Sequence, residues 1–217
     1  NYHCVLLAKN YDGVKELNAL VSKSFNRSDG HFYFTPRITF DELFATSDNI
    51  LVTTACLGGV LNNGTSTAKE KFLGFLRKNK HRCWLEIQHH NCEEQIKYNQ
   101  YLYELSKTID VPLIVGTDTH ALNEEHMIGR EMLQKAKAVR FSNEDAWDLT
   151  FKTPDGLIDA WIKQDSLPME VVYAGINETM RMADMVEEFT LDYSPKYPKL
   201  YDDSEQVFKQ KINEGKI

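Results

Sequence analysis

The sequence predicts an α/β fold that is built on a parallel sheet or barrel. Along residues 1–138, short apolar runs alternate with longer segments whose apolar residues recur at helical spacing. Strands that are separated by helices of this length indicate βαβ units, in which neighbouring strands run parallel. After residue 138 the strand-like runs stop and only helical segments follow. We therefore expect a sheet that is followed by trailing helices.

Four apolar runs predict the strands of the sheet. Each run is short and is bounded by polar or turn-forming residues, which is typical of strands buried in a sheet. The second run leads directly into Cys56-Leu57-Gly58-Gly59, a sequence typical of a sharp turn. The predicted strands are residues 3–8, 49–55, 83–88 and 111–116.

Apolar residues at helical spacing, together with capping residues, predict the helices. Thr39 and Glu42 have the spacing of a capping box. Thr153-Pro154 combines an N-cap residue with proline at the first helical position. The predicted helices are residues 12–25, 39–44, 67–78, 93–109, 123–138 and 153–163, one that begins at residue 168, and one over 204–213.

The composition is that of an ordinary soluble globular chain. The 217 residues are 42% hydrophobic and 26% charged, with a net charge of −7, and the pI is about 5.5. This acidity argues against a broad nucleic-acid footprint, but it leaves room for a metal-lined pocket that takes a nucleotide end. No apolar run approaches the roughly 18 residues that span a bilayer. We therefore expect no membrane association and a cytoplasmic location.

The cysteines and the two ends of the sequence are also informative. The cysteines have no CxxC spacing, which favours reduced, intracellular thiols. The first residue is Asn rather than Met, and the last residue closes no predicted element, so we expect a piece of a longer protein. The cysteines are Cys4, Cys56, Cys83 and Cys92.

Asp118 and His120 form the first candidate metal-binding pair. They follow the apolar run 111–115, and their spacing of two residues places both side chains on the same side of an extended chain. In barrels and open α/β sheets, ligands bind at the carboxyl ends of the strands. A carboxylate together with an imidazole suits zinc, manganese or iron. On the pair alone, capping of the next helix is an equally good interpretation.

Cys56 and His3 are weaker candidates when the residues are considered alone. Cys56 follows the predicted strand 49–55, so it would meet Asp118 and His120 at the same rim of a barrel. A small buried residue at a tight turn is nevertheless the simpler interpretation of this cysteine. His3 starts its strand, and in a parallel arrangement that position lies at the opposite end, so geometry alone does not include His3.

Four further residues are candidate contacts at the rim. Glu86, Gln88 and His90 alternate along one face of the third strand and its exit, where a fully buried strand would be apolar. This pattern indicates either a wet rim or the outward face of an edge strand. Arg37 follows Pro36 in an extended segment and could hold a phosphate, although a lone arginine is more often solvated or ion-paired at the surface.

Several separated segments resemble bacterial replicative DNA polymerases, in the same order and at the same spacing. Together they resemble the PHP (polymerase and histidinol phosphatase) domain of DNA polymerase III alpha subunits over nearly the whole chain. The segments that carry the resemblance are HCVLLAKNYDGVKELNALVSKSF, TTACLGGVLN, WLEIQHH, PLIVGTDTHALNEE, FKTPDGLIDAW, NETMRMADMVE and YPKL.

The resemblance implies part of a distorted (β/α)7 barrel with a metal cluster at one rim. His3, Cys56, Asp118 and His120 match metal-ligand positions of the family, so the resemblance restores His3 to the site. The implied cofactor is a divalent metal, zinc or manganese. The family's opening segment, which carries an H-x-H motif and further Asp, His and Glu ligands, has no counterpart in this sequence. We therefore expect an incomplete metal site and an open barrel in this chain alone.

The resemblance also implies a domain organisation and a function. Residues 1–138 would form a partial PHP barrel, 139–191 its helical C-terminal part, and 192–217 a linker towards the polymerase palm. The parent protein would be a DNA-directed DNA polymerase whose PHP domain is a metal-dependent 3′–5′ proofreading exonuclease. The alternatives are a non-catalytic scaffold that docks a separate proofreading subunit, and a stand-alone phosphoesterase, which the trailing helices disfavour.

The partners implied by the resemblance are the rest of the polymerase chain and, through the parent protein, DNA. The carboxylates of the polymerase palm have no counterpart in this sequence. We therefore expect no polymerase activity from this piece, and we expect the piece alone to be inactive as an exonuclease.

Overall fold

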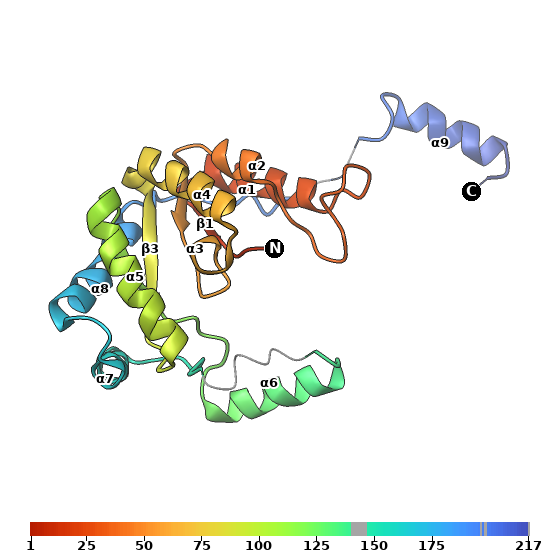
Figure 1. Cartoon of the computed structure of the whole chain (residues 1–217). Coiled ribbons are helices and arrows are strands. Elements are labelled where there is room, and N and C mark those ends of the chain that lie inside the picture. Colours follow the sequence, from red (N-terminus) through yellow and green to blue (C-terminus); the bar gives the residue numbers. More distant parts are fainter. Residues whose placement is uncertain (140–146, 196, 198, 217) are drawn as a thin grey trace.

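The computed structural model describes residues 1–139, 147–195, 197 and 199–216. These residues form a mixed α/β structure around one four-stranded sheet with the strand order β1-β2-β3-β4 (Figure 1). The predicted α/β fold class, with strands first and helices trailing, is confirmed, and it is consistent with a partial barrel. The strands are β1 Val5–Ala8, β2 Ile50–Thr53, β3 Cys83–Gln88 and β4 Leu113–Gly116.

Each predicted helix is present among the described residues, with ends that differ by a few residues at most. The Thr39–Glu42 capping box is formed in both directions, and Thr153 accepts a hydrogen bond from the amide of Gly156. The short helix α3 directly follows the glycine turn and was not predicted. The helices are α1 Tyr11–Ser24, α2 Phe40–Phe44, α3 Val60–Asn63, α4 Ser66–Lys78, α5 Glu93–Ile109, α6 Glu124–Ala136, α7 Pro154–Gln164, α8 Met169–Asp184 and α9 Ser204–Asn213, with a 3-10 turn at Lys80–Arg82.

The expectation that all strands run parallel is wrong for β1. Strands β2, β3 and β4 are parallel, but β1 pairs antiparallel with β2, so that Ala8 lies opposite Ile50 and Val5 opposite Thr53. Helix α1 carries the chain away from the end of β1, and the segment that includes α2 carries it back to the same end. Lys9 donates its amide to the Asn49 carbonyl at 2.8 Å, which closes this return.

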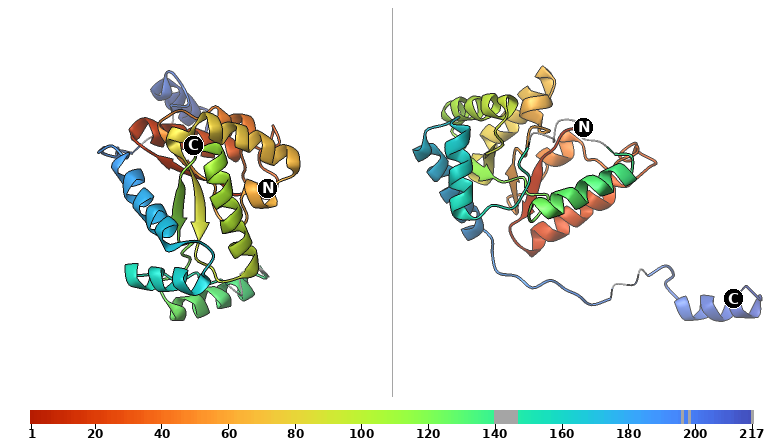
Figure 2. Two further views of the ribbon diagram at one scale, coloured as in Figure 1. Left: turned by 60° about the vertical axis from the view of Figure 1, so that its left-hand side comes forward. Right: turned by 90° about the horizontal axis from the view of Figure 1, so that it is seen from below.

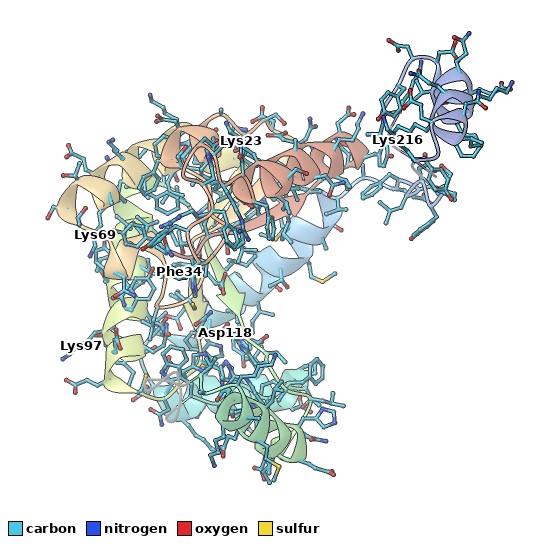
Figure 3. All side chains as sticks on the ribbon, turned by 90° about the vertical axis from the view of Figure 1, so that its right-hand side faces the viewer. Lys23, Phe34, Lys69, Lys97, Asp118 and Lys216 are labelled. Atoms are coloured by element: carbon cyan, nitrogen blue, oxygen red, sulfur yellow. The ribbon has the colours of Figure 1, made fainter. Side chains whose placement is uncertain are left out.

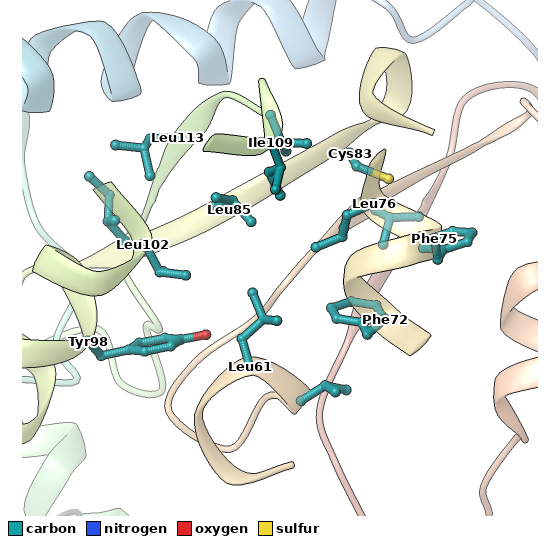
Figure 4. Close-up of a cluster of buried hydrophobic side chains, with 14 of the residues drawn as sticks. Leu61, Phe72, Phe75, Leu76, Cys83, Leu85, Tyr98, Leu102, Ile109 and Leu113 are labelled. Carbon is teal, nitrogen blue, oxygen red and sulfur yellow. The ribbon is translucent and has the colours of Figure 1, made fainter. Parts of the chain in front are cut away.

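One face of the sheet, the packed face, holds the main core. Helices α4 and α5 pack there, and α8 packs against β4 (Figure 2). Figure 4 shows part of this cluster between β3 and the helices α4 and α5. Burying each large aliphatic or aromatic side chain contributes about 1.5–3 kcal/mol to folding. Fully buried members of the cluster include Ile50, Leu61, Phe72, Leu76, Leu85, Ile87 and Leu102.

The opposite face, the site face, changes character along the strands. Towards the amino ends of β3 and β4, Leu51, Trp84 and Ile114 form a small apolar cluster with Met182 of α8. Towards the carboxyl ends, the same face carries polar side chains from β2 and β3. Because side chains alternate between faces with period two, this change places polar groups at the rim of the sheet.

The C-terminal part of the chain extends away from the sheet. After α8 the backbone is extended, and α9 lies apart from the body (Figures 1 and 2). Helix α9 has no buried residue. Within the described ranges, no helix is both long and apolar enough to cross a membrane.

Candidate metal centre

A pocket of about 400 Å³ lies at the rim where the carboxyl ends of the parallel strands meet the start of β1. Its walls include one imidazole, two thiols and two carboxylates from distant parts of the sequence. The pocket therefore gathers side chains that can bind a metal or move a proton. Its lining residues are Tyr2, His3, Cys4, Val5, Ala55, Cys56, Glu86 and Asp118.

His3 and Cys56 are the most closely placed donors. The amide of His3 donates to the Gly58 carbonyl at 2.9 Å, and Nδ1 of His3 lies 3.4 Å from Sγ of Cys56. Because β1 is antiparallel, the start of β1 lies beside the end of β2. The geometric expectation that His3 sits at the opposite end is therefore wrong, and the structure places His3 on the wall of the pocket.

The glycine turn makes room for the histidine ring. A Cβ atom on Gly58 would lie 2.7 Å from Nδ1 of His3, and one on Gly59 would lie 2.3 Å from the Thr54 carbonyl oxygen. Ala55, immediately before Cys56, has a left-handed backbone with φ of 58°. Backbone conformations of this kind cost energy and persist where surrounding structure enforces them.

Asp118 reaches the pocket from the exit of β4. Its φ is 48°, a left-handed conformation that aspartate tolerates better than most residues. Oδ2 lies 3.7 Å from Nε2 of His90, and Oδ1 lies 3.8 Å from Nδ1 of His120. Burial raises the pKa of the Asp118 carboxyl, but the imidazoles of His90, His120 and His3 outweigh burial and leave the pKa below its usual range. Asp118 is therefore an anion at neutral pH.

His120 contacts Asp118 but faces a second cavity. Its Nδ1 donates to the Asp118 carbonyl oxygen at 2.7 Å, which leaves Nε2 free to bind a metal. Together with residues of α6, including Leu133, and with Phe151, His120 lines a cavity of about 820 Å³. The structure thus brings His3, Cys56 and Asp118 to one pocket and places His120 on its border.

The side chains are of the types that bind a divalent metal, and one pair of them has the spacing of two ligands of one ion. Two ligands of one tetrahedral zinc ion lie roughly 3.5 Å apart, which matches the separation of His3 Nδ1 and Cys56 Sγ, 3.4 Å. Burial raises the pKa of the Cys56 thiol, and the Asp118 and Glu86 carboxylates raise it further. Only a bound cation would therefore hold this sulfur as a thiolate at neutral pH. Among the residues that the structure describes, no group of three or more donors is close enough to hold one ion.

Glu86 is the one rim candidate on β3 that lines the pocket. Its Oε2 accepts from the Thr53 hydroxyl at 2.6 Å, and its Oε1 accepts from Nε2 of Gln88 at 2.8 Å. Gln88 and His90 are buried, at 1% and 0% exposure. Because β3 lies between β2 and β4, the edge-strand interpretation of these residues is wrong. Of these three residues, only Glu86 is partly exposed and lines the pocket, as the wet-rim interpretation expects.

A buried amide network, which the sequence did not reveal, holds the segment that leads to His90. Asn99 donates to the Gln88 carbonyl at 2.8 Å, and Gln164 donates to the carbonyls of Gln88 and His90 at 2.9 and 2.7 Å. Asn99 and Gln164 are 0% and 4% exposed. The signal available in the sequence was a set of amide side chains in helices that were predicted to pack on the core.

The His90 ring sits between this network and the pocket. It stacks on Trp147 with ring centroids 5.5 Å apart and an interplanar angle of 15°. Within the described part of the chain, neither ring nitrogen of His90 has a hydrogen-bond partner, and the same holds for His89. Burial lowers the pKa of the His89 imidazole to about 4, so it is neutral at pH 7.

Arg37 does not line the pocket. Its guanidinium donates to the carbonyls of His31 and Tyr33 at 3.2 and 3.3 Å and to Oδ1 of Asn1 at 3.1 Å. It therefore joins the 31–37 loop to the segment that enters β1.

Comparison with known proteins identifies the family. Residues 1–90, which include β1, β2 and β3, match the family model of the PHP domain. The chain contains a PHP domain. PHP domains generally bind divalent metals, in agreement with the donors that converge on the pocket.

The PHP chain is similar to replicative polymerase subunits. It is 34% identical to DNA polymerase III subunit alpha of Borreliella burgdorferi over 138 residues, which cover 61% of this chain and 12% of that protein. It is 30% identical to the subunit of the same name from Aquifex aeolicus over 192 residues, which cover 79% and 16%. A PolC-type DNA polymerase III of Thermotoga maritima is 27% identical over 95% of this chain and 15% of that protein. The chain thus spans less than a fifth of each relative.

Proposed function

We propose that this PHP chain acts in DNA replication, as part of a replicative DNA polymerase, and that its pocket serves a metal-dependent 3′–5′ exonuclease. The convergence of His3, Cys56 and Asp118 on one pocket carries this proposal. Relatives named as DNA polymerase III subunits support the replicative role. The proposed partners are the rest of the polymerase chain and DNA.

The proposed roles follow from the chemistry of each side chain. His3 and Cys56 would supply a neutral imidazole and a thiolate, and Asp118 and His120 would supply a carboxylate and an imidazole at the border of the pocket. When bound there, divalent metal would lower the pKa of water and neutralise the charge of the scissile phosphate. Glu86 keeps its carboxylate aimed into the pocket through the bonds from Thr53 and Gln88.

A second candidate function is a scaffold that docks a separate proofreading subunit. The observation that favours it is the spacing of the donors, which among the described residues approach one another in pairs rather than as a group of three. In that case the pocket would stabilise the domain without cutting DNA. A stand-alone phosphoesterase is less well supported, because the relatives described above are named as DNA polymerases.

An exonuclease assay separates these functions. The product of the complete open reading frame would be incubated with a primer–template whose primer has a mismatched 3′ end, in the presence of zinc or manganese. Release of 3′ nucleotides, lowered at least about 100-fold by Asp118→Asn, would support the exonuclease. The matched control is Asp155→Asn, an exposed carboxylate in the first turn of α7. Activity that Asp118→Asn leaves unchanged would reject this site, and absence of any activity would favour the scaffold.

A further inference from the structure

The loop between α1 and α2 presents two aromatic rings to solvent. Tyr33 is 67% exposed and Phe34 is 83% exposed, and their ring centroids are 4.5 Å apart in an edge-to-face arrangement. Single exposed apolar residues are common on protein surfaces, but two adjacent exposed rings on one loop are a feature of interaction sites. The rings form a pair that we call the aromatic tip.

The backbone of this loop is constrained. The amide of Thr35 donates to the Tyr33 carbonyl at 2.8 Å, and Phe34 between them has φ of 61°. A bulky residue rarely adopts this left-handed conformation, so the surrounding loop must enforce it. His31 anchors the base of the loop, because its ring contacts Asp29 at 2.6 Å and Glu42 at 2.8 Å. These contacts fix the loop in a conformation that keeps the aromatic tip exposed to solvent.

Two guanidinium groups lie against aromatic rings of this loop, although the whole chain is acidic. The Arg37 guanidinium lies 5.8 Å from the Tyr33 ring centroid, and the Arg27 guanidinium lies 4.8 Å from that of Phe32. Among the described residues, no carboxylate lies within ion-pair distance of either arginine. Aromatic rings flanked by guanidinium groups are the combination that binds single-stranded nucleic acid through stacking and phosphate contacts.

The aromatic tip is connected to the wall of the metal pocket. Arg37 donates to Oδ1 of Asn1, and Nδ2 of Asn1 donates to the Thr35 hydroxyl at 3.4 Å. The next two residues, Tyr2 and His3, line the pocket. Phe34 and Asp118 can both be located in Figure 3. A strand that rests on the tip would therefore have the pocket within reach.

We propose that Tyr33 and Phe34 form a stacking platform for unpaired bases of single-stranded DNA, with Arg37 beside them for the backbone phosphates. The platform would guide a frayed 3′ end into the pocket. This role of the platform rests on the proposed exonuclease function. A duplex hides its base faces, so the platform selects unpaired over paired DNA. The chemistry that is recognised, a base face followed by a phosphate, is independent of base sequence.

Fluorescence anisotropy with a labelled oligo-thymidine strand tests the platform. Binding is measured on the complete reading-frame product in EDTA, so that it requires no metal. Removing one stacking ring weakens single-strand binding about tenfold or more. We expect this loss for Tyr33→Ala and Phe34→Ala, and retained binding for Tyr33→Phe and Phe34→Trp, which keep a ring. The matched control is Tyr193→Ala, which removes a ring that is 84% exposed outside the loop.

Three outcomes would overturn the proposal. The first is equal binding by wild type and the Tyr33→Ala/Phe34→Ala double variant, and the second is a preference for blunt duplex over single strand. The third is a double variant that binds DNA as wild type does but melts at a lower temperature or self-associates differently. The two rings would then pack against protein rather than DNA. If single-strand binding depends on the rings but the purified protein retains no metal, the exonuclease proposal is rejected and the platform is kept. If metal-dependent cleavage occurs but does not depend on the rings, the platform is rejected and the exonuclease proposal is kept.

Discussion

Nδ1 of His3 lies 3.4 Å from Sγ of Cys56, although the two residues stand at opposite ends of the strands that carry them. The antiparallel pairing of β1 with β2 produces this contact, because it places the start of one strand beside the exit of the other. If β1 were parallel to β2, the pocket would lose its imidazole. The direction of this edge strand is therefore the structural basis of the proposed metal site.

Gly58→Ala should weaken metal binding with little effect on folding. The new Cβ would lie 2.7 Å from Nδ1 of His3 and would push the ring away from Cys56. We expect at least about tenfold weaker zinc affinity, measured by competition with a chromophoric chelator. The matched control is Gly74→Ala, because a Cβ on Gly74 in α4 meets no atom within 4 Å. That change should leave zinc affinity intact and stabilise α4 by about 0.5–1 kcal/mol. Equal zinc affinity of both variants would exclude a role for the His3 ring.

Gln164→Ala should destabilise the protein strongly. The change removes the Nε2 group that donates to the carbonyls of Gln88 and His90. The Gln88 carbonyl keeps its bond from Asn99, whereas the His90 carbonyl loses the bond from Gln164 in a buried region. A buried group left unsatisfied costs about 1–3 kcal/mol, so we expect a loss of about 1–3 kcal/mol in the free energy of unfolding, measured by urea titration. Gln210→Ala on the exposed helix α9 serves as the control and should change stability by less than about 0.5 kcal/mol. A small effect of Gln164→Ala would mean that water replaces the amide.

The ion cluster at the base of the aromatic loop predicts a pH dependence. Hydrogen bonds to Asp29 and Glu42 raise the pKa of His31 above its ordinary value of 6.5. Burial opposes ionisation of Glu42, but bonds from Lys23, Thr39 and His31 lower its pKa to about 2, so Glu42 stays charged from mildly acidic to alkaline pH. A raised histidine pKa stabilises the folded state fully below pH 6.5 and loses this effect as pH rises through the folded pKa.

The corresponding measurement is a thermal unfolding series on wild type and His31→Asn. The difference in melting temperature between the two should be largest near pH 5.5 and should shrink by about pH 9. His81→Asn is a suitable control, because His81 is more than half exposed and contacts an exposed aspartate. A difference for His31→Asn that grows with rising pH would contradict the assigned ion cluster.

Local features of the fold could be predicted from the sequence. The helix start at Thr39 and the one at Thr153 follow from capping chemistry within a few residues, and the structure forms both caps. The strand Cys83–Gln88 has the bounds that its apolar run predicted. These features depend on neighbours in the sequence, which is why a single sequence suffices for them.

Features that depend on distant parts of the chain could not be predicted in this way. The direction of β1 depends on how residues 9–49 return to the sheet, and no local pattern fixes that path. The buried amide network of Asn99 and Gln164 joins three elements, α5, α7 and the segment from the end of β3 to His90. His3 entered the candidate site through family resemblance, and its contact with Cys56 became understandable only with the sheet topology.

Metal content by plasma mass spectrometry tests the central claim most directly. The product of the complete open reading frame would be compared with its Cys56→Ser and Cys92→Ser variants after purification without chelators. We expect about stoichiometric zinc or manganese in wild type and Cys92→Ser, with most of it lost in Cys56→Ser. Equal metal content in all three proteins, or none in any, would contradict the assignment of this pocket as a metal centre.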